Sequence, residues 1–114
     1  MTIEELIKES HQTAVEHGWW EEERNIGECL ALMHSEISEA LEEWRDGFHL
    51  NSVYYKTYTP GKPNKPEGFT VELADLLIRV FDLCGRHNLP LVEALQEKMA
   101  YNKTRPYRHG GKVA

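Results

Sequence analysis

Apolar residues recur at helical spacing through most of the chain. Between residues 26 and 47 they follow one another every three or four positions, which predicts a long amphipathic helix. The apolar positions of this helix are Ile26, Cys29, Leu30, Met33, Ile37, Ala40, Leu41 and Trp44. Asn25 is a suitable N-cap, and Gly47 is a suitable residue to end the helix.

Three further helices are predicted around this one. Thr2 followed by Glu5 is a capping-box signature and begins a short amphipathic helix. Thr70 can cap a helix that continues to about residue 86, and Pro90 fits the first turn of a last helix that reaches about residue 102. The helix over 70–86 is apolar on nearly every side, which indicates a central position in the fold.

Residues 48–69 interrupt the helical pattern. Prolines and glycines punctuate this stretch, which also contains three of the tyrosines. We predict an inserted Tyr/Pro-rich loop here, irregular or folded into a short β-ribbon. Residues 103–114 have no periodicity and form a basic C-terminal segment. The expected fold is therefore one all-α domain over residues 1–114, with four main helices.

Size and composition are those of a globular single-domain protein. The chain has 114 residues, of which 40% are hydrophobic and 28% are charged. Its two cysteines are too few for a disulfide framework, and we expect both to be small buried residues. There is no long apolar run, and the N-terminal residues do not resemble a secretory signal. We therefore expect a cytoplasmic protein with no membrane partner.

Charge is distributed unevenly along the chain. The formal net charge is −6, yet no acidic residue follows Glu97. The basic residues of this last part are Lys98, Lys103, Arg105, Arg108 and Lys112. An acidic body with a basic end does not favour binding of nucleic acid over the whole surface. It suits a small polyanion that is held by cations at one place and by metal at another.

Carboxylates lie where apolar residues are expected. At about 100° per residue, Glu36 lies inside the apolar arc of its helix and Glu39 borders that arc. Glu72 and Asp75 belong to a narrow polar strip on the apolar helix over 70–86. A buried carboxylate without a partner costs several kcal/mol, so we expect the two acidic edges to face each other around divalent cations.

The residue types favour particular metals. Oxygen ligands without cysteine or histidine favour Mg²⁺ or Mn²⁺ over zinc. A di-iron protein is disfavoured, because those bundles use Glu-x-x-His pairs and this chain has none. The other charged residues of the strip, Arg79, Asp82 and Arg86, are predicted to form ion pairs within their own helix at i,i+3 and i,i+4 spacing.

These motifs resemble those of the MazG-type all-α nucleoside triphosphate pyrophosphohydrolases. The family signature is Glu-Glu-x-x-Glu on one helix and Glu-x-x-Asp on the next. Here the first motif reads Ser35-Glu36-x-x-Glu39, with serine in place of the first glutamate, and the second reads Glu72-x-x-Asp75. The segment KMAYNKTRPYRHGGK, residues 98–112, resembles the end of small single-domain members. The resemblance extends from about residue 19 to residue 112.

The resemblance implies a MazG-like helical bundle that hydrolyses a ribo- or deoxyribonucleoside triphosphate between the α and β phosphates. The products would be the monophosphate and pyrophosphate. The implied catalytic metal ligands are Glu36, Glu39, Glu72 and Asp75. The candidates for holding the substrate are Lys98, Asn102, Arg105, Arg108, His109 and Lys112, with Trp20 as a candidate for stacking on the base. Adjacent tryptophans such as Trp19 and Trp20 more often cover the edge of a core or an interface.

Two alternatives remain open at this point. One is a non-catalytic helical module that binds a nucleotide or a protein partner, and the other is a dUTPase-like or diphosphate-cleaving phosphohydrolase of related fold. In each case the helix over 70–86 has more apolar faces than a chain of this length can cover. We therefore expect a homodimer or a dimer of dimers.

Overall fold

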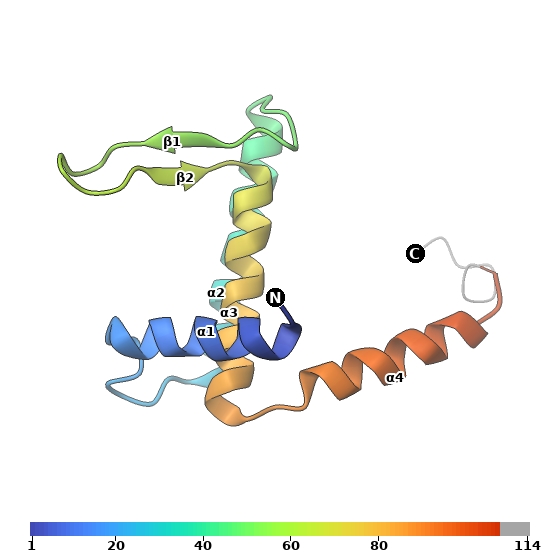
Figure 1. Cartoon of the computed structure of the whole chain (residues 1–114). Helices are drawn as coiled ribbons and strands as arrows, with labels where there is room; N and C mark the ends of the chain where they lie inside the picture. The colour runs from blue at the N-terminus through green and yellow to red at the C-terminus, as the bar shows by residue number, and fades with distance from the viewer. Residues whose placement is uncertain (108–114) are drawn as a thin grey trace.

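The computed structural model describes residues 1–107 and is mostly helical over that range (Figure 1). Its helices are α1 (Ile3–Glu16), α2 (Ile26–Arg45), α3 (Phe69–His87) and α4 (Leu91–Thr104). Two short strands, β1 (Tyr54–Lys56) and β2 (Lys65–Glu67), lie between α2 and α3. All four predicted helices are therefore present. Within the described range, none of them has the length and apolar character needed to cross a lipid bilayer.

The first two helices begin at their predicted caps. The Thr2 hydroxyl accepts a hydrogen bond from the backbone N–H of Glu5 at 3.1 Å and donates one to the Glu5 carboxylate at 3.2 Å. The Asn25 side chain accepts from the backbone N–H of Glu28 at 3.2 Å. These contacts satisfy N–H groups that have no partner within the helix. Both caps are local in sequence, which is why the sequence pattern identifies them.

The start of α3 differs from the prediction. Thr70 is not the N-cap, because its hydroxyl donates to the backbone oxygen of Leu50 at 2.7 Å. Gly68 occupies the cap position with a φ of 135° and no side-chain hydrogen bond. A Cβ atom at this position would collide with the backbone oxygen of Ser52. The chain thus enters α3 through a close crossing that only glycine permits, and Thr70 fastens the first turn to the segment after α2.

Residues 48–69 contain an antiparallel β-ribbon. Tyr54 pairs with Glu67, and Lys56 pairs with Lys65. The predicted insertion is therefore ordered in part as a ribbon. Its second strand ends at Glu67, which is buried beside the start of α3.

α1 to α3 form the packed part of the molecule. α2 and α3 lie side by side, and α1 crosses α3 (Figure 1). At this crossing a Cβ on Gly85 would lie 2.6 Å from the Cβ of His11, so glycine lets the two helices approach closely. The buried apolar residues of the described part are Trp20, Cys29, Ala40 and Cys84. The two cysteines are free and buried, as predicted.

α4 extends away from the other helices (Figure 1). Its residues from Glu93 to Thr104 are all exposed, so the described residues of one chain do not form a four-helix bundle. The radius of gyration is 17.1 Å, against about 13 Å for a compact domain of this length. The chain exposes 8935 Å², against about 6,400 Å² for a compact protein of this mass.

We expect Gly68→Ala to destabilise the protein far more than Gly61→Ala. Both glycines have positive φ, but a Cβ on Gly61 meets nothing within 4 Å. Gly61→Ala should therefore cost about 1 kcal/mol for the backbone conformation alone. Gly68→Ala adds the collision with Ser52 and should cost about 3 kcal/mol or more. Urea unfolding followed by circular dichroism measures both, and equal losses would contradict the close crossing.

Candidate metal centre

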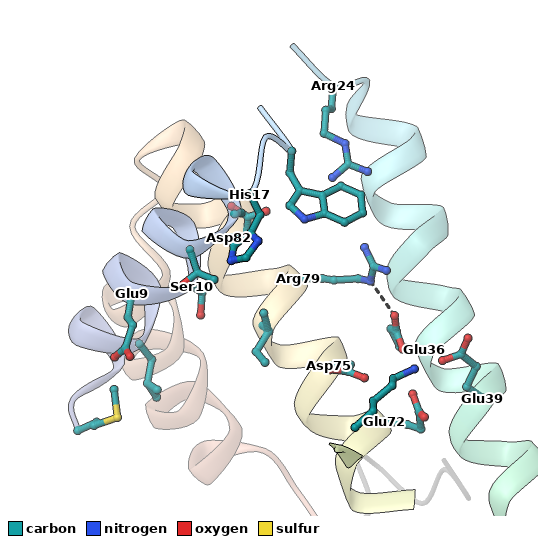
Figure 2. Close-up of a pocket in the computed structure, with 17 residues that line it drawn as sticks. Glu9, Ser10, His17, Arg24, Glu36, Glu39, Glu72, Asp75, Arg79 and Asp82 are labelled. Carbon is teal, nitrogen blue, oxygen red and sulfur yellow. Dashed lines mark hydrogen bonds and ion pairs between the residues drawn. The ribbon is translucent and has the colours of Figure 1, made fainter. Parts of the chain in front are cut away.

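Three carboxylates from the two central helices converge on one point (Figure 2). Glu36 and Glu39 of α2 and Glu72 of α3 each offer an oxygen, and these oxygens lie within 4.8 Å of one another. The i,i+3 spacing puts both α2 side chains on the face that meets α3. Glu36 and Glu72 are each only 6% exposed, whereas Glu39 is exposed. The predicted convergence is thus present for three of the four acidic residues.

The buried oxygens lack enough partners. Glu36 Oε1 accepts a hydrogen bond from Arg79 Nε at 2.8 Å. The Oε2 atoms of Glu36 and Glu72 are buried and have no hydrogen-bond partner within residues 1–107. Such atoms are costly to leave unpaired. One guanidinium against three carboxylates leaves the centre short of positive charge.

The surroundings raise the pKa of Glu72 and of Asp75 and lower the pKa of Glu36. Burial, together with the close approach and negative charge of Glu39 and Glu36, raises the pKa of Glu72 to about 8. Burial acts on Glu36 in the same sense, but its hydrogen bonds, chiefly the one from Arg79, hold the pKa of that carboxyl below its usual value. Burial and then the charge of Glu36 raise the pKa of Asp75. The raised pKa of Glu72 predicts that, without a cation, this carboxyl binds a proton more tightly than an exposed glutamate does.

A cavity of about 730 Å³ adjoins the carboxylates between α1, α2 and α3. This volume is within the range of small-molecule sites. Asp75 and Arg79 of α3 line this cavity. Lys65, the first residue of β2, lines it from the β-ribbon, and Trp19 and Arg24 line it from the segment after α1. Asp75 shares the cavity with the three converging glutamates but is not one of the oxygens within 4.8 Å.

A second group of carboxylates adjoins the first. Glu43 of α2 and Glu67 of β2 offer oxygens that, together with one from Glu72, lie within 4.8 Å of one another. Tyr54 donates its hydroxyl to Glu43 Oε1 at 2.7 Å, and Tyr58 donates to Glu67 Oε1 at 3.0 Å. The hydrogen bond to Glu43 raises the pKa of Tyr54 to about 12. Glu67 was not among the predicted site residues, because its only local signal is its place beside glycine at the end of the Tyr/Pro-rich stretch.

The prediction that the polar strip of α3 forms ion pairs within its own helix was wrong. Arg79 pairs with Glu36 across the helix interface. Asp82 Oδ1 accepts from His11 Nδ1 and from Trp20 Nε1, each at 2.9 Å. Arg86 pairs with Glu23. Because the strip faces neighbouring elements, its partners lie on them, and the strip ties α3 to α1, to α2 and to the segment between those two helices.

Trp20 lies at the edge of the core, the usual place of adjacent tryptophans. It is 7% exposed, its indole N–H donates to Asp82, and Arg86 lies 4.9 Å from its ring centroid. This burial does not favour Trp20 as the base-stacking residue. Trp19 is exposed and lines the cavity, so it is the better placed of the two tryptophans.

The other candidates for substrate binding lie apart from the carboxylates. Lys98 and Asn102 lie on α4, which extends away from the other helices (Figure 1), and Arg105 follows its last residue. None of the three lines the cavity. Lys98 and Arg105 contact the ring of Tyr101. The remaining three, Arg108, His109 and Lys112, lie outside the described residues.

No family model matches this chain, and comparison with curated proteins and with solved structures gives no match.

We expect the metal-free protein to lose stability as the pH rises from about 5 to 9. The folded state raises the pKa of Glu72 from 4.5 to about 8, so its proton stabilises the fold. This stabilisation is complete below pH 4.5 and is lost as the pH rises through 8. Thermal unfolding in a chelator should show a fall in Tm of about 5 °C or more.

Glu72→Gln should flatten this dependence, because the amide does not titrate. Glu97→Gln on the exposed part of α4 is the matched control and should keep the wild-type slope. The same slope in Glu72→Gln as in the wild type would contradict the assignment of the proton.

Proposed function

We propose that the protein is a metal-dependent nucleoside triphosphate pyrophosphohydrolase. In this proposal it cleaves the bond between the α and β phosphates to give a monophosphate and pyrophosphate. The observation that carries the proposal is the pair of buried, unpartnered carboxylate oxygens of Glu36 and Glu72 beside a cavity of nucleotide size. The resemblance of the two acidic motifs and of the C-terminal segment to MazG-type enzymes supplies the substrate class.

The donor set fits Mg²⁺, with Mn²⁺ as an alternative. The proposed ligands are Glu36, Glu39, Glu72 and Asp75, which offer oxygen and no sulfur or imidazole. Ser35, which replaces the first glutamate of the family motif, donates its hydroxyl to the backbone oxygen of Leu32 at 2.6 Å. Because its hydroxyl hydrogen is directed to the backbone, Ser35 is not among the proposed metal ligands.

The remaining residues of the cavity suit a triphosphate. A divalent cation here would offset phosphate charge and lower the pKa of an attacking water. Arg79 holds Glu36 in place through its hydrogen bond and keeps that carboxyl ionised. Lys65 and Arg24 add cations to the cavity wall, and the exposed ring of Trp19 offers a face on which a base can stack.

The basic residues of the C-terminal part require a second chain in this proposal. Lys98, Asn102 and Arg105 lie on or just after a helix that extends away from its own cavity. We therefore propose a homodimer, with a dimer of dimers as the larger form. The C-terminal part of one copy would then serve the cavity of the other.

An exposed apolar face supports the dimer. The exposed large apolar residues of α2 fall within an arc of about 60°: Ile26, Leu30, Ile37, Leu41 and Trp44. On α3 the exposed large apolar residues are Leu73, Leu77 and Ile78, of which Ile78 lines the cavity. The chain exposes about 2,500 Å² more than a compact protein of its mass, and a stable interface needs about 800 Å² from each partner. We propose that a second copy of the same chain covers this apolar face.

The activity test is hydrolysis of ribo- and deoxyribonucleoside triphosphates with Mg²⁺. We expect pyrophosphate and a monophosphate as products, resolved from orthophosphate by chromatography. Glu72→Gln should lower kcat by about 100-fold or more, since it removes a ligand oxygen from the cation that offsets phosphate charge. Glu93→Gln, on an exposed position of α4, should keep wild-type activity.

Other outcomes distinguish the alternatives. Release of orthophosphate alone would contradict cleavage between the α and β phosphates, and hydrolysis of diphosphates would indicate a diphosphate-cleaving enzyme. Absence of Mg²⁺ and Mn²⁺ binding in calorimetric titration would leave a non-catalytic helical module.

The dimer is tested by sedimentation equilibrium. We expect twice the 13.2 kDa chain mass, or a multiple of it, for the wild type. Leu41→Glu should shift the protein to monomer, because it puts a charge into the apolar face of α2. Val15→Glu on α1 is the matched control, since Val15 and Leu41 are both 48% exposed. A monomeric wild type would contradict the proposal.

A further inference from the structure

We infer that the chain holds a second divalent cation, bound by Glu43, Glu67 and Glu72, with Glu72 shared between the two cations. This inference rests on the proposed metal centre and extends it to the β-ribbon. The three carboxylates come from α2, from the end of β2 and from the first turn of α3. Their oxygens lie within 4.8 Å of one another.

Buried oxygens without partners point to a ligand at this place. Glu72 is 6% exposed, and its Oε2 has no hydrogen-bond partner in the described part of the chain. Glu43 Oε2 is buried and unpartnered in the same way, and Glu67 is 8% exposed. Glu43 as a whole is half-buried, and a divalent cation among the three carboxylates would pair the buried oxygens that lack a partner.

Tyrosines hold two of these carboxylates from the other side. Tyr54 donates a hydrogen bond to Oε1 of Glu43 at 2.7 Å. The other carboxylate oxygen of Glu43, Oε2, is buried and has no hydrogen-bond partner among the described residues. Tyr58 donates to Oε1 of Glu67 at 3.0 Å. Hydrogen bonds of this kind orient metal ligands and fix which oxygen is free to bind. The ribbon therefore supplies both a ligand and the groups that position the ligands.

The basic side chains beside the second group of carboxylates do not offset its negative charge. Lys65 pairs with Glu67 at 3.4 Å, and the side chains are 61% and 11% exposed, so the glutamate has one cationic partner that lies mostly in solvent. Around this end of the cavity stand six carboxylates and two cationic side chains, the latter being Lys65 and Arg79. The carboxylates are Glu36, Glu39, Glu43, Glu67, Glu72 and Asp75. A second divalent cation would offset negative charge that a single cation leaves uncompensated.

Sharing Glu72 places the two cations close together. Protein sites with two metals and a common ligand hold them about 3.5–4 Å apart. At such a separation two Mn²⁺ ions are magnetically coupled, so their paramagnetic resonance spectrum differs from that of isolated ions. This gives a readout that does not depend on activity.

The test uses the full chain and Mn²⁺ alone, with calorimetry to count ions and paramagnetic resonance to detect coupling. We expect two ions per chain and a coupled spectrum for the wild type. Glu67→Gln and Glu43→Gln should each bind one ion with an uncoupled spectrum. Glu42→Gln, an exposed position of α2 that pairs with Arg45, is the matched control and should bind two.

The outcomes separate this inference from the proposed function. One ion in the wild type, lost in Glu39→Gln but kept in Glu67→Gln, would overturn the second site and leave the first. Two ions without coupling would overturn the shared Glu72. No bound ion would overturn both. Circular dichroism checks the fold of each variant, and Glu43→Gln serves if Glu67→Gln does not fold.

Discussion

The enclosure of carboxylates between α2 and α3 is the constraint on which the rest of the structure depends. Where two central helices of a small domain normally bury apolar side chains, this chain buries Glu36 and Glu72, and Arg79 donates a hydrogen bond to Glu36. The buried apolar set of the described residues is correspondingly small. Such an interior is stable only if a proton or a cation occupies it, which makes stability and ligand binding properties of the same residues.

The polar strip of α3 has a second consequence, because its charged residues organise the elements around it. Arg79 binds α2, Asp82 binds His11 of α1 together with Trp20, and Arg86 binds Glu23. α3 is therefore central in a different sense from an apolar core helix. Its apolar faces give packing, while its polar strip fixes the orientation of its neighbours. The close crossing at Gly85 brings α1 near enough for the contact between Asp82 and His11.

The sequence predicted those interactions that join residues close together along the chain or that follow from helical periodicity. The caps at Thr2 and Asn25 join residues three apart, and both were found as predicted. The convergence of Glu36 and Glu72 followed from helical periodicity, because Glu36 lies inside the apolar arc of its helix and Glu72 lies in the narrow polar strip of an otherwise apolar helix. The cap at Gly68 depends on the distant Ser52, and the burial of Glu67 depends on strand register, so no local pattern contained them. The partners of Arg79 and Asp82 required the relative orientation of helices, which periodicity does not give.

The separation of charge along the sequence has a structural counterpart in one chain. The carboxylates surround a cavity between α1, α2 and α3, whereas α4 carries the first cations of the basic part away from it. Opposite charges on one small protein attract, and the attraction acts over about 10 Å at moderate ionic strength. A chain that keeps them apart leaves both available to another molecule. The proposed dimer uses this arrangement, since a two-fold assembly lets the basic residues at the end of α4 and after it approach the acidic cavity of the other copy while the exposed apolar face of α2 becomes covered.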